Sequence, residues 1–146
     1  RLGRGLAAAT RPGESIVLGA IGAASYPTEL YVFDRYGLVT REVAAREARG
    51  GRRRSPGHDK AVPVTFFLED EPTYLNAELA RPAGVRGAVR ELEGWSNQAV
   101  RARWAPELRP VELDGERFVL VLLARTDRAE AAWKEAMGKA REVAGP

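Results

Sequence analysis

The sequence predicts an α/β domain built on a three-layer, Rossmann-like sheet that is mostly parallel and carries an antiparallel hairpin near its C-terminal end. Three observations lead to this prediction. The run Ile16 to Leu18 is apolar and rich in β-branched residues, as in a strand buried on both faces of a parallel sheet. Leu30 to Phe33 forms a second strand after a turn with Gly19 and Gly22. Asp114-Gly115 joins two extended runs, which favours a tight hairpin.

Length and composition bound the remaining possibilities. The 146 residues can bury a core, and we expect a single soluble α/β domain over residues 1–146. The absence of cysteine excludes disulfides and thiolate metal sites, and a single histidine, His58, excludes a histidine-based metal cluster. No apolar run approaches the roughly 18 residues that a membrane span requires. The chain begins at Arg1 rather than methionine, so we expect it to be part of a longer protein.

Apolar spacing and turn residues predict the other elements. Helices are expected over residues 2–10, 40–48 and 85–100, and a single helical turn over residues 25–29. A last helix begins near Thr126 or Asp127, where Glu130 completes a capping box with Asp127. Residues 63–71 fit either a short helix or a strand, and Thr73 to Leu79 alternate as a third strand.

These elements give an expected packing. The strands that begin at Ser15, Leu30 and Thr73 should be parallel, with helices on both faces of the sheet. The last helix should bury a stripe of four residues, Trp133, Met137, Ala140 and Val143. The centre of the core should consist of Ile16, Val17, Leu18, Val32, Leu75, Val119 and Val121.

A basic segment between Arg41 and Lys60 is the strongest charge feature of a chain whose net charge is +3. Its basic side chains lie among glycine, serine and proline, and they are Arg46, Arg49, Arg52, Arg53, Arg54 and Lys60. Such a segment attracts phosphate, anionic lipid or nucleic acid through charge, or it is a solvated connection.

Motifs of known catalytic chemistry are few. The stretch Gly19-Ala-Ile-Gly22 lacks the third glycine and the spacing of the dinucleotide fingerprint. A serine triad would have to use His58, which has no nucleophile-elbow pattern around it. The consecutive acids Glu69 to Glu71 resemble a helix end more than an acid–base pair. We therefore expect no cofactor, no metal and no catalytic residue in this chain.

The candidate ligand site lies where the first two strands end. Parallel strands bring their carboxyl ends to one edge of a sheet, and ligands of open α/β sheets bind there. The Gly19–Gly22 turn, the Asp34–Gly37 turn and the Gly57–Lys60 loop should converge at this edge. The candidate ligand-binding residues are Gly22, Tyr26, Asp34, Arg35, Gly37, His58, Asp59 and Lys60. Either Arg35, His58 and Lys60 donate hydrogen bonds to a phosphate or sugar hydroxyl while Asp34 holds one of them in place, or Asp34 and His58 only hold the loop in place.

A set of short motifs carries a resemblance, and the order of the set is more specific than any single member. The members are Gly22-Ala23-Ala24-Ser25-Tyr26, Asp34-Arg35-Tyr36-Gly37-Leu38, Val43-Ala44-Ala45-Arg46, Gly57-His58-Asp59-Lys60 and Pro72-Thr73-Tyr74-Leu75. Over about the first 80 residues the chain resembles the C-terminal soluble domain of bacterial multi-spanning GT-C glycosyltransferases of the mannosyl- and arabinosyltransferase kind. It departs from them at Val39-Thr40, where a polar-acidic pair is expected, and in the insertion of Arg52 to Arg54.

The resemblance implies where the domain lies in the cell and which part of the protein is catalytic. The catalytic carboxylate of such enzymes, which use polyprenyl-phosphate sugars, lies in an extracytoplasmic loop near the first membrane spans. This chain would be a non-catalytic accessory domain on the periplasmic or outer face of the membrane. It would pack on the membrane part of the same polypeptide and help position a glycan or a lipid-linked acceptor.

Two other functions remain open on the sequence. One is a freestanding binding module for a phosphorylated small molecule, which would use the glycine turn and the basic segment. The other is a nucleic-acid binder led by Arg52 to Arg54, ranked last because no aromatic side chains are interleaved with these arginines.

Overall fold

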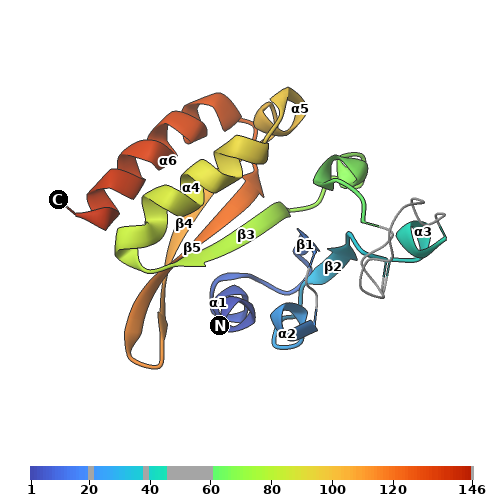
Figure 1. The fold of residues 1–146 in the computed structure, drawn as a ribbon, viewed down its shortest axis with the longest axis horizontal. Helices are drawn as coiled ribbons and strands as arrows, with labels where there is room; N and C mark the ends of the chain where they lie inside the picture. Colours follow the sequence, from blue (N-terminus) through green and yellow to red (C-terminus); the bar gives the residue numbers. More distant parts are fainter. Residues whose placement is uncertain (20–21, 38–39, 46–60, 146) are drawn as a thin grey trace, which may run out of the picture.

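The computed structural model describes residues 1–19, 22–37, 40–45 and 61–145, and a five-stranded mixed sheet lies at its centre (Figure 1). The strands lie in the order β2-β1-β3-β5-β4. They are β1 (Ser15–Leu18), β2 (Tyr31–Asp34), β3 (Tyr74–Ala80), β4 (Trp104–Leu113) and β5 (Glu116–Arg125). The helices are α1 (Leu2–Ala9), α2 (Gly22–Ser25), α3 (Arg41–Ala44), α4 (Val85–Trp95), α5 (Gln98–Arg101) and α6 (Ala129–Ala144), with 3₁₀ turns η1 (Val64–Phe67) and η2 (Pro82–Gly84).

The first three strands are parallel, which confirms the expectation for that part of the chain. β1 pairs with β2 from Ser15 opposite Tyr31 to Leu18 opposite Asp34, and it meets β3 where Ile16 lies opposite Tyr74. β5 runs antiparallel to both of its neighbours, β3 and β4. The sheet therefore has a short parallel half and a long antiparallel half.

The predicted Rossmann-like, mostly parallel sheet is wrong. The hairpin strands β4 and β5 span ten residues each, whereas β1 and β2 span four each. β5 also inserts beside β3, so antiparallel pairing extends to the middle of the sheet. A Rossmann-like unit usually joins its parallel strands through a crossover that carries a helix long enough to cover the sheet. The helix between β1 and β2 is the four-residue α2.

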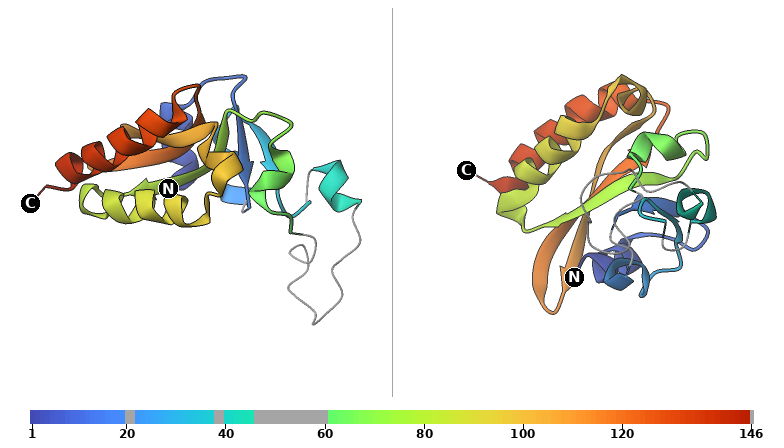
Figure 2. Two further views of the ribbon diagram at one scale, coloured as in Figure 1. Left: turned by 90° about the horizontal axis from the view of Figure 1, so that it is seen from above. Right: turned by 45° about the vertical axis from the view of Figure 1, so that its right-hand side comes forward.

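Helices pack on both faces of the sheet, and each face has its own apolar core. α4 and α6 lie side by side on one face, where Leu92 and Trp133 join the larger core (Figures 1 and 2). α1 packs against β3, β4 and β5 on the other face, where Leu6 is fully buried in the smaller core. None of the described helices is long and apolar enough to cross a bilayer.

The Asp114-Gly115 hairpin is confirmed. Both residues have positive φ, 56° at Asp114 and 74° at Gly115, as a tight turn between twisted strands requires. The guanidinium of Arg4 in α1 donates two hydrogen bonds of 2.8 Å to the Asp114 carboxylate. α1 is thus tied to the end of the hairpin.

The helix predicted over residues 85–100 is two helices. α4 ends at Trp95, and the Ser96 hydroxyl donates to the Leu92 carbonyl at 2.6 Å. Asn97 then caps α5 by accepting a hydrogen bond from the Val100 amide at 3.0 Å. An asparagine side chain that satisfies a free amide starts a new helix, and the chain changes direction there.

Other helix boundaries also differ from the prediction. α6 begins at Ala129 without a side-chain cap, because the Thr126 hydroxyl accepts from the Arg128 amide instead of capping the helix. The predicted capping box is therefore absent. The single turn expected over residues 25–29 lies earlier, as α2, and within residues 63–71 only η1 is helical. The end of the helix predicted over residues 40–48 lies outside the described residues.

The predicted core is largely confirmed. Six of its seven members are buried, namely Ile16, Val17, Leu18, Leu75, Val119 and Val121. Val32 is only half-buried, because β2 is an edge strand. In α6, Trp133 and Ala140 are buried and Met137 is half-buried, but Val143 is 40% exposed because the helix extends past the sheet.

Candidate functional site

The turn after β2 is built around the buried side chain of Asp34. This carboxylate is fully buried, and one of its oxygens accepts a hydrogen bond from the Tyr36 amide at 2.9 Å. The Asp34 amide donates to the Thr40 hydroxyl at 2.7 Å, so Thr40 holds the turn and gives α3 no side-chain cap. A short acidic side chain that bonds the amide two residues ahead is a stable turn former. Asp34 therefore fixes the shape of the candidate edge.

Gly37 allows α3 to approach this turn closely. Its φ is +75°, and a Cβ at this position would lie 2.7 Å from the Ala44 nitrogen. Any larger residue would push α3 away and would adopt a strained backbone conformation.

Two of the three segments predicted to converge do meet. A Cβ on Gly19 would lie 3.1 Å from Cε2 of the Tyr36 ring, so the first glycine turn packs beneath the second turn. The Arg35 amide donates to the Leu18 carbonyl at 3.1 Å, which joins the ends of β1 and β2. The predicted convergence of the Gly57–Lys60 loop, with His58, Asp59 and Lys60, lies outside the described residues and stays a prediction.

Arg35 and Tyr26 occupy different surroundings. Arg35 is half-buried, its Nε donates to the Val62 carbonyl at 2.9 Å, and its own carbonyl accepts from the Val62 amide at 2.9 Å. Part of this guanidinium thus holds the chain where it returns toward η1. Tyr26 is 93% exposed after α2, and Gly22 at the start of α2 is exposed as well. These two residues can meet a partner without any rearrangement of the turn.

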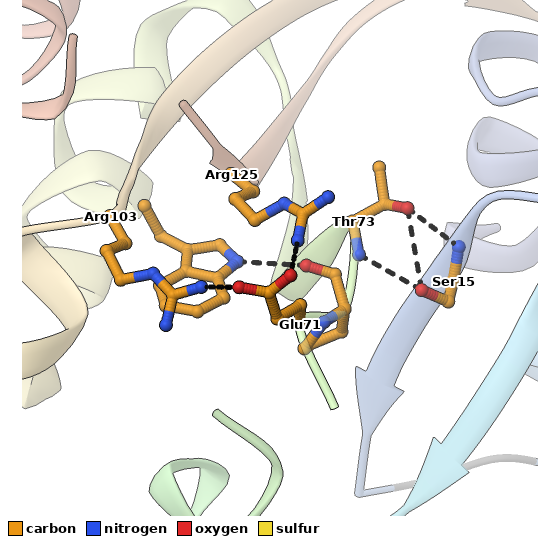
Figure 3. A network of polar contacts seen from close by, with 7 residues as sticks. Ser15, Glu71, Thr73, Arg103 and Arg125 are labelled. Carbon is orange, nitrogen blue, oxygen red and sulfur yellow. Dashed lines mark hydrogen bonds and ion pairs between the residues drawn. The ribbon is translucent and has the colours of Figure 1, made fainter. Parts of the chain in front are cut away.

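A second polar cluster, at the opposite end of the parallel strands, was not anticipated from the sequence (Figure 3). Ser15 and Thr73 bond each other reciprocally, with amide-to-hydroxyl distances of 3.1 and 3.0 Å, and so join β1 to β3. Beside them the Glu71 carboxylate accepts hydrogen bonds from Arg103 and from Arg125, the latter at 2.9 Å.

The register of the predicted hairpin was the sequence feature from which part of this cluster could have been predicted. Once Leu113 lies opposite Glu116, the register places Trp104 opposite Arg125 and brings Arg103 beside them. Trp104 is fully buried below, and its indole Nε1 donates to the Pro72 carbonyl at 3.0 Å. The Arg103 guanidinium lies 5.0 Å from the centre of a Trp104 ring. What the sequence could not show was that Glu71 would lie between the two arginines.

Tyr74 is the most perturbed titratable residue of the described chain. Its side chain is 1% exposed, and its hydroxyl has no hydrogen-bond partner among the described residues. Burial raises the pKa of Tyr74 to about 12, the nearby Glu14 carboxylate adds to the rise, and the Arg109 guanidinium opposes it. Within the described residues, no group of three or more acidic or histidine side chains is placed to hold a metal ion.

Comparison with known proteins identifies the family but no function. Residues 1–132 match the model of a family described as a domain of unknown function (DUF8728). Because this match spans most of the chain, the chain belongs to that family. No curated protein and no solved structure matches it.

Proposed function

We propose that this chain is a non-catalytic accessory domain of a bacterial membrane glycosyltransferase of the GT-C type. In this proposal it lies on the extracytoplasmic face of the membrane, packs on the membrane-embedded part of the same polypeptide, and helps to position a glycan or a lipid-linked acceptor. The chemistry belongs to the membrane part, which transfers sugar from a polyprenyl-phosphate donor.

One observation carries the proposal. The motifs of the resemblance that lie between residues 34 and 45 are contiguous in space as well as ordered in sequence. Asp34 is buried at the strand end, Gly37 lies against the backbone of Ala44, and Val43 is fully buried beneath them. Tyr36, from the same motif, covers Gly19. A rigid turn next to exposed side chains at the carboxyl edge of parallel strands is suited to holding a ligand.

The proposal is tested by titrating the protein with short glycans and with polyprenyl-phosphate analogues while its NMR spectrum is recorded. We expect shifts at Gly19, at residues 34–37 and at residues 57–60, and weaker binding in the Asp34→Asn and His58→Ala variants. Tyr26→Ala should weaken binding as well, because Tyr26 is an exposed candidate ligand residue, and this variant tests direct contact without altering the turn. Shifts confined to the hairpin or to α6 would refute this site.

Activity provides an independent test. The isolated chain should transfer no sugar from any polyprenyl-phosphate donor although it folds. Turnover by the purified chain that is lost in His58→Ala would show that the domain is itself the enzyme.

The second candidate is a freestanding binding module for a phosphorylated small molecule, and the basic residues between Arg41 and Lys60 favour it. The codons upstream of Arg1 separate the two candidates. Several apolar spans encoded there would support the accessory domain, whereas a start codon immediately before Arg1 would support the freestanding module. Nucleic-acid binding ranks third for the reason given above.

A further inference from the structure

The hairpin places two arginines side by side at the amino end of β3. Arg103 immediately precedes β4 and Arg125 ends β5, and the carbonyl of Arg103 accepts a hydrogen bond from the Thr126 amide at 2.8 Å. The spacing of the pair is therefore set by the antiparallel register and by the Trp104 indole beneath Arg103. It does not depend on the acidic residue that the two arginines share.

That acidic residue, Glu71, is held in an unusual backbone conformation. Its φ is +48°, and apart from Asp114 in the hairpin turn it is the one non-glycine residue of the described chain with positive φ. It also precedes Pro72, a position at which the proline ring restricts the backbone to extended conformations. Glycine or asparagine would adopt positive φ more easily. The two arginines offset this strain by binding one carboxylate oxygen each (Figure 3).

The two arginine side chains are accessible to solvent and have N–H donors that make no hydrogen bond within the described residues. The side chains of Arg103, Arg125 and Glu71 are 45%, 43% and 54% exposed. A guanidinium carries five N–H donors, and within the described residues each of these two guanidinium groups donates one hydrogen bond, to Glu71. Two adjacent guanidinium groups match the oxygens of a carboxylate or a phosphate.

We propose that Arg103 and Arg125 form a binding site for a compact oxyanion, a carboxylate or a phosphate group, and that Glu71 is the internal ligand of this site. An external oxyanion binds when the Glu71 side chain leaves the pair. The site is separate from the candidate edge at Asp34, because it lies at the opposite end of the parallel strands, so it does not rest on the proposed function.

The surrounding charges restrict the ligand. Glu69 and Asp70 are exposed next to Glu71, and they repel an extended polyanion. A single small oxyanion group, which two guanidinium groups can neutralise, suits the site better than nucleic acid does. This charge pattern also makes Glu71 a competitor for the donors, so binding to the unsubstituted protein should be weak.

The test uses Glu71→Gly, which removes the internal carboxylate and relieves the positive φ. Each protein is titrated with inorganic phosphate or with acetate at constant ionic strength, with chloride as the reference anion. The readout is the indole N–H signal of Trp104, which lies beneath Arg103 and donates to Pro72. If Glu71 occupies the pair about nine-tenths of the time, its removal lowers the apparent Kd for the oxyanion about tenfold.

Three controls make the result specific. Asp70→Asn removes the same charge one residue away without freeing the arginine donors, so it should leave the apparent Kd nearly unchanged. Glu71→Gly combined with Arg125→Gln should abolish the gain. Glu71→Asn, which also tolerates positive φ, repeats the test if the glycine variant does not fold.

The proposal is overturned by any of three results. These are no oxyanion-dependent shift of the Trp104 signal in a folded Glu71 variant, an equal response to chloride, and an equal gain in Asp70→Asn. A response to phosphate, to acetate or to both supports it, and the difference between them identifies the preferred oxyanion.

Discussion

Replacing Tyr74 by phenylalanine should make this protein more stable, although it removes a polar atom. Tyr74 begins β3 and lies in the core beneath α1, and its hydroxyl is buried without a hydrogen-bond partner among the described residues. The Arg109 guanidinium lies 5.5 Å from the centre of the Tyr74 ring, but it donates to the Ala9 carbonyl and to the Glu107 carboxylate. The phenol therefore loses its hydration in the folded state, and the neighbouring Glu14 and Arg109 side chains, which shift its pKa in opposite directions, give it no hydrogen bond of normal geometry in exchange.

The size of the effect follows from that desolvation. A buried polar group without a partner costs about 1–3 kcal/mol, whereas the phenylalanine ring keeps the packing of the tyrosine ring. We expect Tyr74→Phe to raise the free energy of unfolding by about 1 kcal/mol at neutral pH. Tyr74→Leu is the matched control, because it also removes the hydroxyl but loses ring packing, and it should destabilise the fold.

The pH dependence gives a second measure of the same group. The folded pKa of Tyr74, about 12, lies above the ordinary value of 10.0, so the unfolded chain ionises first as pH rises. Burial of Tyr74 therefore has no pH-dependent effect on stability below pH 10, and the folded state loses stability between about pH 10 and 12, because the ionised phenol is disfavoured in the core. A shift of two units corresponds to about 2.7 kcal/mol at most.

Urea unfolding followed by tryptophan fluorescence, at pH 7 and at several values up to 11.5, measures both effects. The stability of Tyr74→Phe should fall less between pH 10 and 11.5 than that of the parent protein, because phenylalanine does not ionise. If the variant is instead less stable than the parent by about 1 kcal/mol, and the alkaline loss is unchanged, the hydroxyl is hydrogen-bonded in solution, through bound water for example, and the reasoning fails.

The remaining predictions concern packing and backbone conformation. Gly37→Ala should lower the free energy of unfolding, measured in urea, by about 2–3 kcal/mol. The reason is that φ is +75° and the added methyl would lie 2.7 Å from the Ala44 nitrogen. An unchanged free energy of unfolding would mean that α3 can move away. Gly138→Ala should raise the melting temperature and increase the free energy of unfolding by about 0.5–1 kcal/mol, because alanine favours the helical conformation inside α6. No atom lies within 4 Å of the added Cβ. A lower melting temperature would contradict this open surface. Trp104→Phe should lower the free energy of unfolding by about 1–3 kcal/mol, because the Pro72 carbonyl loses its indole donor. Thermal unfolding measures this change. An unchanged melting temperature would show that β3 does not need this hydrogen bond.

Features that depend on neighbouring residues were predictable. Asp114-Gly115 was expected to form a hairpin, and the positive φ of both residues agrees with this. The apolar run Ile16 to Leu18 was expected to be buried, and it is. The position of Asp34 at a strand end, near the turn of Gly19, also followed from the order of the elements. In each case a few adjacent residues carry the information, because turn chemistry and strand alternation act over short distances.

The tertiary structure decided which strands became neighbours and which side chains met. Asp-Gly joins β4 to β5 but does not say that β5 will pair with β3, where Ala80 lies opposite Val119; that pairing makes the sheet mixed instead of mostly parallel. The meeting of Glu71 with Arg103 and Arg125 is a consequence of the same pairing. Contacts across 32 and 54 residues of chain depend on loop closure and on burial of the whole sheet, and no local pattern records them.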